Sequence, residues 1–398
     1  MRALPAAFLV VALVAARRRA VAVALAAVLG VTLTAGGCRP DKSAQSEEPA
    51  PDVSYEELPP APTGSEDPHN RRSVVPVPKG TSPRAVEFTD ADTGYALFTS
   101  CVAGLACNAG LVLTLDGGFS WVARKLPFDA ATEVDMRLGR GNVLIVKAPP
   151  SGYYVSRDTG RTFEKRPLEP PPSELNLAEP RYQANCPEVG ASDCPTRQLT
   201  QVADNGVRTA LPGKPAGNHV FTSLAAADDG KLWLSAKAVD GTANPPVATI
   251  SVWTSVDKGQ HWVSEGSVHP PDPTVEPRLA VNPGGSAVWL VGGRFAAMRT
   301  GVGKWTEATA VREVAEIYSA EVLGGGNLLV ASGQGVWLVS LTQRVRDEAA
   351  RTVFRLRRLD ATTILGYPAQ QSGEVWLCTL TEKTQPNCDW SRVAVAAG

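Results

Sequence analysis

The stretch Ser156-Arg157-Asp158-Thr159-Gly160-Arg161-Thr162-Phe163 sets a pattern that the chain repeats: Ser or Thr, any residue, Asp, any, Gly, any, Ser or Thr, aromatic. An earlier copy, Thr114-Leu115-Asp116-Gly117-Gly118-Phe119-Ser120-Trp121, fits every position. A later copy, Ser255-Val256-Asp257-Lys258-Gly259-Gln260-His261-Trp262, departs only at the seventh. Residues 202–206 keep only the Asp and the Gly, and residues 299–305 keep a Gly and the aromatic. The Asp positions 116, 158, 204 and 257 are spaced by 42, 46 and 53 residues.

Each copy has the chemistry of a tight turn between two strands. A short Asp side chain accepts hydrogen bonds from backbone amides just downstream, and Gly adopts the positive φ that a side chain opposes. The hydroxyl closes the turn, and the aromatic residue returns to the core. We assign this structural role, rather than a catalytic one, to Thr114, Asp116, Gly118, Ser120, Trp121, Ser156, Asp158, Gly160, Thr162, Phe163, Ser255, Asp257, Gly259 and Trp262.

The three copies resemble the Asp-box, or BNR, repeat of sialidase-like β-propellers, of sortilin-type propellers and of the photosystem II assembly-factor family. The resemblance rests directly on 24 residues. It implies an all-β propeller, and the period of the repeat leaves room for about four short strands in each unit. In propellers ligands usually bind around the central channel, so we expect the box turns to face away from the functional surface.

A second repeat series can be counted without the boxes. Apolar runs that follow Gly-containing turns are centred on residues 95, 144, 233, 289, 329 and 376. The interval between the second and third is about twice the others, which predicts an unrecognised unit around Cys186 and Cys194. Filling it gives seven four-stranded blades of about 47 residues, with six or eight left open. Fully apolar runs suit strands buried between blades, so the tryptophans of the runs and of the box ends are interpreted as core, with carbohydrate stacking as the alternative.

The N-terminal region has the features of an export signal. Arg17-Arg18-Arg19 precedes an apolar run, and the small residues Ala35-Gly36-Gly37 come before Cys38. This resembles a bacterial lipobox, although Ala35 stands where Leu is commoner. The resemblance implies a signal peptide over 1–37, a lipid on Cys38 that holds the protein to a membrane and, because Arg39 follows, delivery to an outer membrane in a two-membrane bacterium. Ordinary secretion and a retained transmembrane anchor are the alternatives.

Residues 38–84 are rich in Pro, Glu and Ser and bury too little apolar surface to fold alone. We interpret them as a disordered tether that precedes a single propeller domain over 85–398. Within the tether, Ser73-Val74-Val75-Pro76-Val77 is a candidate edge strand that closes the propeller.

Six cysteines remain after Cys38, and they fall into three close couples. Such spacing predicts local disulfides in an oxidising compartment. The pairs are Cys101 with Cys107, Cys186 with Cys194, and Cys378 with Cys388. The spacings that zinc sites require are absent and the four histidines are scattered, so we expect no metal.

No catalytic motif stands out. The sequence has no G-x-S-x-G, P-loop, dinucleotide or H-E-x-x-H pattern, and we predict no cofactor. Sialidases need an arginine triad, a Tyr/Glu pair and an Asp. Arg84, Arg181 and Arg278 are the arginines that could be argued into a triad, but none has the family's local motif.

The formal net charge of −1 gives no reason to expect nucleic acid as a partner. The one charged stretch, 344–358, carries six arginines and two acids. We interpret it as a solvated outer strand with Arg355 and Arg357 on an exposed edge, and an anion-binding patch is the alternative.

Together these observations predict a non-catalytic lipoprotein of the cell envelope whose propeller is a protein-binding or assembly platform. The alternative is a glycan-binding protein or a sialidase-like hydrolase with unrecognised catalytic residues.

Overall fold

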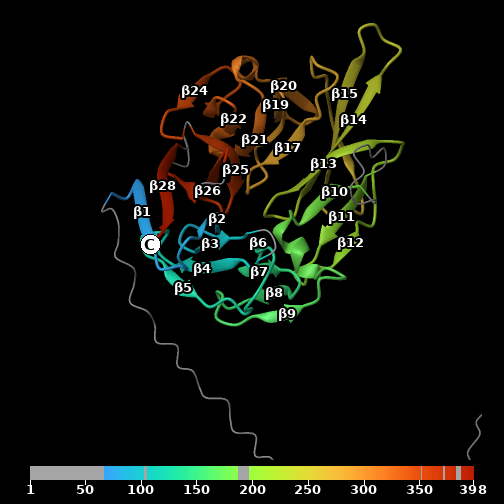
Figure 1. The fold of residues 1–398 in the computed structure, drawn as a ribbon. Helices are drawn as coiled ribbons and strands as arrows, with labels where there is room; N and C mark the ends of the chain where they lie inside the picture. Colours follow the sequence, from blue (N-terminus) through green and yellow to red (C-terminus); the bar gives the residue numbers. More distant parts are fainter. Residues whose placement is uncertain (1–66, 103–104, 187–196, 351, 371–372, 382–386) are drawn as a thin grey trace, which may run out of the picture. The chain divides into compact units, whose positions relative to one another are not determined.

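The computed structural model describes residues 67–102, 105–186, 197–350, 352–370, 373–381 and 387–398. These residues form seven small sheets, the blades of an all-β propeller, arranged in a ring (Figure 1). The predicted fold class and blade number are therefore confirmed. The predicted signal peptide, Cys38 and most of the predicted tether lie outside the described residues. Among the described residues, no helix is both long and apolar enough to cross a membrane.

Blades 1, 2 and 4 each have four strands in sequence order. Blade 1 comprises β2 (Ser82–Phe88), β3 (Gly94–Ser100), β4 (Asn108–Thr114) and β5 (Val122–Arg124). Blade 2 comprises β6 (Asp135–Gly139), β7 (Val143–Ala148), β8 (Gly152–Ser156) and β9 (Glu164–Arg166). Blade 4 comprises β13 (Val220–Ala226), β14 (Leu232–Asp240), β15 (Val247–Ser255) and β16 (Val263–Val268).

Blades 5 and 6 repeat this plan, and blade 7 extends it to five strands. Blade 5 comprises β17 (Arg278–Val281), β18 (Val288–Gly292), β19 (Phe295–Gly301) and β20 (Lys304–Glu307). Blade 6 comprises β21 (Ile317–Val322), β22 (Leu328–Ser332), β23 (Gly335–Val339) and β24 (Arg344–Asp347). Blade 7 comprises β25 (Val353–Arg358), β26 (Thr363–Pro368), β27 (Glu374–Leu380), β28 (Cys388–Ala397) and β1 (Asn70–Val75). Short 3-10 helices, η2 (Thr309–Glu313) and η3 (Gly324–Gly326), lie in connections.

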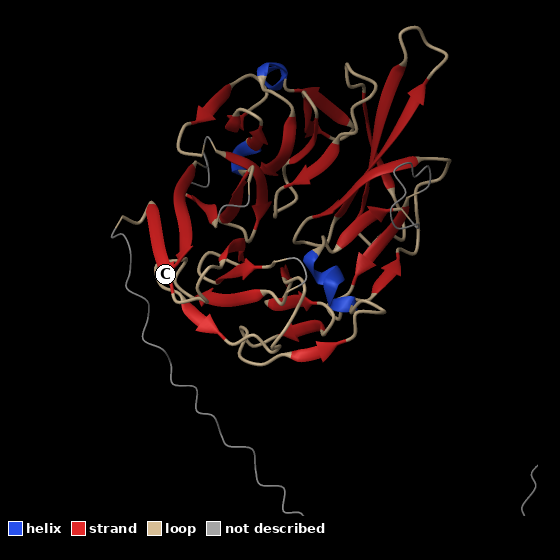
Figure 2. Cartoon of the chain, in the orientation of Figure 1, coloured by secondary structure: helices blue, strands red, loops and turns tan. Residues whose placement is uncertain are grey.

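Blade 3 has only three described strands, β10 (Tyr182–Asn185), β11 (Gln198–Val202) and β12 (Arg208–Ala210). The 3-10 helix η1 (Ser173–Ala178) packs on β6 and β7, where other blades place their first strand (Figure 2). Its Leu177 is buried beside Val143 and Val202. The preceding Pro170-Pro171-Pro172 lacks amide donors, so this segment is unable to pair as an inner strand. Blade 3 is the unit that the sequence analysis predicted around Cys186 and Cys194, between the second and third apolar runs.

The N-terminal strand β1 closes the ring. It pairs in parallel with β28, from Asn70 opposite Arg392 to Val75 opposite Ala397. The candidate edge strand is therefore present, and it adds a fifth strand to the last blade. The predicted boundary at residue 85 is too late, because both β1 and the start of β2 fall within the predicted tether. Proline content suggested a tether here, but Val75 is only 1% exposed.

The apolar runs centred on 95, 144, 233, 289 and 329 lie on the second strand of their blades. The sixth does not, because Trp376 lies on β27, the third strand of blade 7, and β26 takes the second position. Trp121, Trp233 and Trp289 are buried, at 1% exposure or less. Trp262, Trp305 and Trp376 are half-buried.

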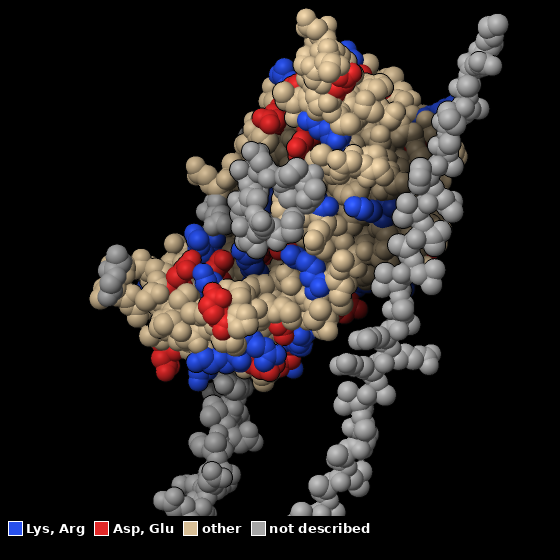
Figure 3. All heavy atoms as spheres, turned by 90° about the vertical axis from the view of Figure 1, so that its right-hand side faces the viewer, with Lys and Arg blue, Asp and Glu red and all other residues tan. Residues whose placement is uncertain are grey.

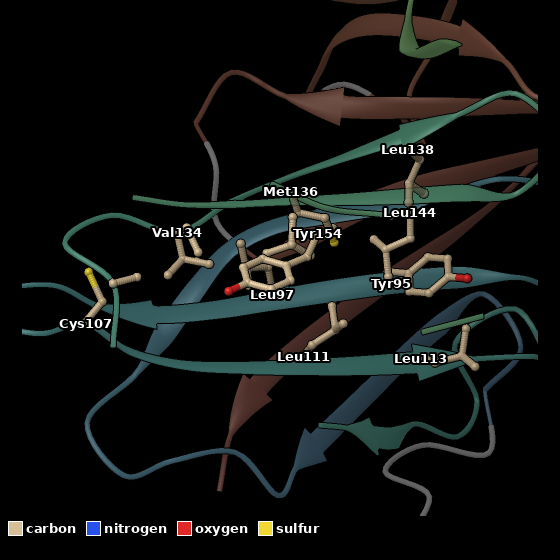
Figure 4. Close-up of a cluster of buried hydrophobic side chains, with 13 residues drawn as sticks. Tyr95, Leu97, Cys107, Leu111, Leu113, Val134, Met136, Leu138, Leu144 and Tyr154 are labelled. Carbon is tan, nitrogen blue, oxygen red and sulfur yellow. The ribbon is translucent and has the colours of Figure 1, made fainter. Parts of the chain in front are cut away.

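The core consists of several clusters, many of them shared by neighbouring blades. Figure 4 shows one, in which Tyr95 and Leu97 of blade 1 face Met136 and Leu144 of blade 2. The apolar runs of the second strands fill such seams, which is why they lack a polar face.

Strand direction gives the propeller two different faces. Because strands alternate in direction, the turns between third and fourth strands lie at one end of every blade, which we call the box face. Connections between blades and turns between second and third strands lie at the other end, which we call the channel face. The three boxes join β4 to β5, β8 to β9 and β15 to β16, so all three belong to the box face.

Candidate functional site

The box turns are held by their own side chains. Asp158 accepts hydrogen bonds from the Ser156 hydroxyl at 2.8 Å, the Thr162 amide at 2.9 Å and the Thr162 hydroxyl at 2.6 Å. The Gly160 amide donates to Ser156 Oγ at 2.9 Å, and the φ of Gly160 is 75°. The same bonds recur in the first box among Thr114, Asp116, Gly118 and Ser120. In the third box, His261 Nδ1 lies 2.6 Å from Asp257 Oδ2 and replaces the hydroxyl.

Replacing Asp158 with Ala should lower the free energy of unfolding at pH 7 by about 1–2 kcal/mol, because several hydrogen bonds to a charged group are lost. Burial alone would raise the pKa of Asp158, but the bonds from Thr162 and Ser156 outweigh it and lower the pKa to about 2. This contribution is present above the unfolded pKa, near 3.8, and disappears as the pH falls through about 2. The free energies of unfolding of wild type and Asp158→Ala, measured with urea at several pH values, should therefore become equal in acid.

Arg161→Ala is the matched control, because the Arg161 side chain is exposed in the same turn and only its backbone amide bonds Asp158. It should leave stability nearly unchanged. A difference between wild type and Asp158→Ala that stays constant down to pH 2 would contradict the assignment.

The boxes also contact the preceding blade. Arg124 Nε donates to the Thr159 carbonyl at 3.0 Å, across the seam between blades 1 and 2. Trp262 Nε1 donates to the Gly213 carbonyl at 3.2 Å, just after β12. Arg71 Nη1 of β1 donates to the Gly117 carbonyl at 2.6 Å and so joins blade 7 to blade 1. The hydrogen-bonding groups of the boxes described here thus bind other parts of the fold.

On the channel face, the first strands of four blades carry a β-bulge at corresponding places. Each bulge inserts one extra residue opposite the second strand, and such insertions redirect a side chain. The extra residues are Arg84 in β2, Thr222 in β13, Tyr318 in β21 and Phe354 in β25. All four line cavities.

Two of the bulged strands, β13 and β21, are hydrogen-bonded to the next blade directly beside the bulge. The Leu279 amide of β17 donates to Ser223 Oγ at 3.1 Å, and the Leu356 amide of β25 donates to Ser319 Oγ at 2.7 Å. Ser223 and Ser319 each follow a bulged residue, so the hydroxyl reaches the next inner strand. These bonds fix the bulged positions relative to the adjacent blade.

Three cavities open among these strands. The first, of about 1130 Å³, lies between β17, β21 and the connections that precede them. The second, of about 450 Å³, lies between β2, β25 and β26, and Tyr318 lines both. The third, of about 370 Å³, lies beside Arg197 and Thr222. Sequence reasoning singled out Arg84, Arg278 and Arg355 without placing them at these cavities. It missed Thr222, Tyr318 and Phe354, because a bulge has no short sequence motif.

The cavities carry charges of both signs. In the first cavity, Asp272 and Glu316 are in no ion pair among the described residues, whereas in the second cavity the two signs differ in their pairing. In the second cavity, Glu87 lies 3.1 Å from Arg357, and Glu374 pairs with Arg392. By contrast, among the described residues no carboxylate lies within ion-pair distance of Arg84, Arg278, Arg294 or Arg355. The second cavity therefore offers two guanidinium groups, those of Arg84 and Arg355, with which its own acids are not paired. The side of the molecule in Figure 3 instead shows Lys and Arg interspersed with Asp and Glu.

A tyrosine and a glutamate meet in the second cavity. The Tyr367 hydroxyl donates to Glu87 Oε2 at 2.6 Å. Burial and the charge of Glu87 raise the pKa of Tyr367, so the phenol stays protonated. Arg355 lies over the Tyr367 ring, 4.1 Å from its centroid.

The three arginines considered for a triad lie apart. Arg84 lines the second cavity and Arg278 the first and third, whereas Arg181 pairs with Asp204.

The charged stretch 344–358 divides between two blades. Arg344–Asp347 is β24, an outer strand, as interpreted. The exposed-edge interpretation is wrong for Arg357, because β25 is the innermost strand of blade 7. Arg357 Nη2 donates to the Phe88 carbonyl at 2.7 Å, and Arg358 pairs with Glu321 at 3.4 Å. Long guanidinium side chains here cross the seams between blades, which alternation in the sequence does not reveal.

Two predicted disulfides are formed, Cys101 with Cys107 and Cys378 with Cys388. Cys194 lies outside the described residues, so its pairing with Cys186 stays a prediction. Among the described residues, no group of three or more His, Cys, Asp or Glu side chains is placed to hold a metal ion.

No protein-family model and no curated protein matches this chain. Among solved structures, it is similar to YCF48 bound to D1 peptide, with 16% identity, a TM-score of 0.43 and coverage of 82% of this chain and 99% of that one. It is also similar to YCF48 from Cyanidioschyzon merolae, with 13% identity, a TM-score of 0.39 and coverage of 76% of this chain and 96% of that one. A third similar structure is the Hadza microbial sialidase Hz136, with 13% identity, a TM-score of 0.30 and coverage of 78% of this chain and 65% of that one. At such identities the likeness concerns the fold alone.

Proposed function

We propose that this chain is a non-catalytic protein-binding or assembly platform of the cell envelope, anchored by a lipid on Cys38, and that its partner binds the channel face. One observation carries the proposal. Four blades use a bulge at corresponding places to turn Arg84, Thr222, Tyr318 and Phe354 toward the cavities. Bulges interrupt the ladder of hydrogen bonds and are typical of functional sites in sheets.

In the second cavity, the distribution of charge supports binding over catalysis. A general acid or nucleophile needs a carboxyl or hydroxyl group with a suitable pKa. In the second cavity both described glutamates are in ion pairs, and the pKa of Tyr367 is raised. The unpaired guanidinium groups of Arg84 and Arg355 are suited to hydrogen-bond carboxylates of a partner.

The closing strand leaves this face accessible. Because β1 runs parallel to β28, Asn70 lies toward the box face and Val75 toward the channel face. His69 Nδ1 lies 3.4 Å from Asp389, near the box-face end of β28. The first described residues thus lie toward the box face, opposite the proposed binding surface.

Affinity capture from crosslinked cells, followed by mass spectrometry, tests the proposal. We expect wild type to recover an envelope protein, Cys38→Ala to lose it through mislocalisation, and Arg84→Glu with Arg278→Glu to reduce its recovery by about tenfold or more. Arg161→Glu makes the same kind of charge reversal at one position on the box face and should have no effect. If the double variant recovers the partner as well as wild type, the channel face is not the binding surface.

The hydrogen bond between Tyr367 and Glu87 favours one other function, sialidase-like hydrolysis, since that chemistry uses a Tyr/Glu pair. The platform proposal predicts no release of fluorophore from a fluorogenic sialoside by the purified protein. Hydrolysis of the sialoside by wild type that is abolished in Tyr367→Phe would favour the hydrolase over the platform.

A further inference from the structure

The junction of the first two cavities presents two aromatic rings. Tyr318 lines both cavities and is 54% exposed, whereas most large apolar side chains on the inner strands are buried. Its ring lies 6.4 Å from that of Phe354, with an angle of 16° between their planes. Each ring is carried by a bulged residue, so neighbouring blades contribute one ring each.

The two rings are near-parallel, and the fold leaves Tyr318 exposed and Phe354 half-buried. Aromatic side chains interact favourably with other rings in offset or edge-to-face arrangements. Aromatic residues in pockets are also the residues that most often dominate binding energy at protein interfaces. The bulges hold these rings at the place where both cavities meet.

A fixed guanidinium group lies beside the rings. Arg355 follows Phe354 in β25, and its guanidinium carbon lies over the Tyr367 ring, 4.1 Å from the ring centroid. The Tyr367 hydroxyl is held in turn by Glu87, which pairs with Arg357. The contact with the ring restrains the Arg355 guanidinium group. Its N–H groups are in no ion pair with a described carboxylate, and such groups suit a carboxylate of a ligand.

We infer that Tyr318 and Phe354 form a subsite for an aromatic side chain of the partner, and that the partner segment is acidic, with a carboxylate held by Arg355. A polypeptide fits better than a neutral glycan, because sugar hydroxyls need several free carboxylate or amide groups. Among the described lining residues of the second cavity, Gln370 is the one amide side chain and both glutamates are paired. The inference rests on the proposed function and adds the chemistry of its ligand.

Titration of the purified chain with blocked peptides tests the subsite. The probes are Glu-Glu-Tyr-Glu-Glu and the same peptide with Ala in place of Tyr, with affinities measured by calorimetry or ligand-observed NMR. We expect the tyrosine peptide to bind wild type about tenfold more tightly than the alanine peptide. Tyr318→Ala should bring this ratio to about one, and Tyr318→Phe should restore it.

Arg355→Gln should weaken both peptides and preserve the ratio, because it removes only the contact with the carboxylate. Val256→Ala, which trims an 81% exposed apolar residue on the box face, is the control and should change neither affinity. Equal affinities of wild type for the two peptides, no binding of the tyrosine peptide, or a ratio that Tyr318→Ala leaves intact would each overturn the inference.

The failure of the subsite and the failure of the platform can be told apart by capture from cells. If Tyr318→Ala keeps the partner and the arginine double variant loses it, the platform stands and the aromatic subsite does not. If both variants keep the partner, the channel face is not the binding surface at all.

Discussion

Replacing Trp289 with Ala should lower the free energy of unfolding by about 3–5 kcal/mol, a loss typical of large buried aromatic residues. Trp289 is 0% exposed and lies in the core cluster shared by blades 5 and 6, with Val311 of η2 and Val330 of β22. Its indole nitrogen has no hydrogen-bond partner among the described residues. The loss should therefore come from packing, and urea unfolding with intrinsic fluorescence measures it.

Trp376→Ala provides the comparison. In the sequence the two tryptophans occupy the same place in Val-Trp-Leu runs. In the structure Trp376 lies on the third strand of its blade and is half-buried. We expect the free energy of unfolding to fall by about 1–2 kcal/mol, because folding removes less of the apolar surface of Trp376 than of Trp289 from water. If the two variants lost the same free energy of unfolding, the environment of each tryptophan would follow from its place in the sequence repeat and not from its strand position.

The repeat could be predicted because its determinants are local. A box specifies its own turn through side chains at most a few residues apart, as the bonds from Ser156 and Thr162 to Asp158 show. A fully apolar second strand is likewise visible wherever it occurs. These two signals suffice for seven blades even though η1 replaces one strand and the sixth run belongs to another position.

The candidate site could not be predicted in the same way. Arg84 and Arg355 come from opposite ends of the propeller sequence, and only closure of the ring brings both to the second cavity. Whether Arg355, Arg357 or Arg358 is free depends on acids such as Glu87, more than 250 residues away. The sequence shows six arginines between 344 and 358, but pairing across the seams decides which of them a ligand could reach.

Replacing Val75 with Asp should lower the free energy of unfolding by about 3 kcal/mol or more. Val75 is 1% exposed and lies in the cluster that joins blade 7 to blade 1, with Val393 and Phe98. The substitution removes a buried valine, worth about 1.5–3 kcal/mol, and adds the cost of burying a carboxyl group. Thermal or urea unfolding of the full chain measures the loss.

The adjacent residue is a matched control for the closing strand. Val74 belongs to the same strand and is 55% exposed, so Val74→Asp makes the same chemical change on the solvent side. It should change stability by no more than about 0.5 kcal/mol. If β1 did not close the ring, both residues would be solvated and the two variants would be alike. A large difference between neighbours can arise only if the strand is paired and buried on one side, so the contrast tests the closure itself.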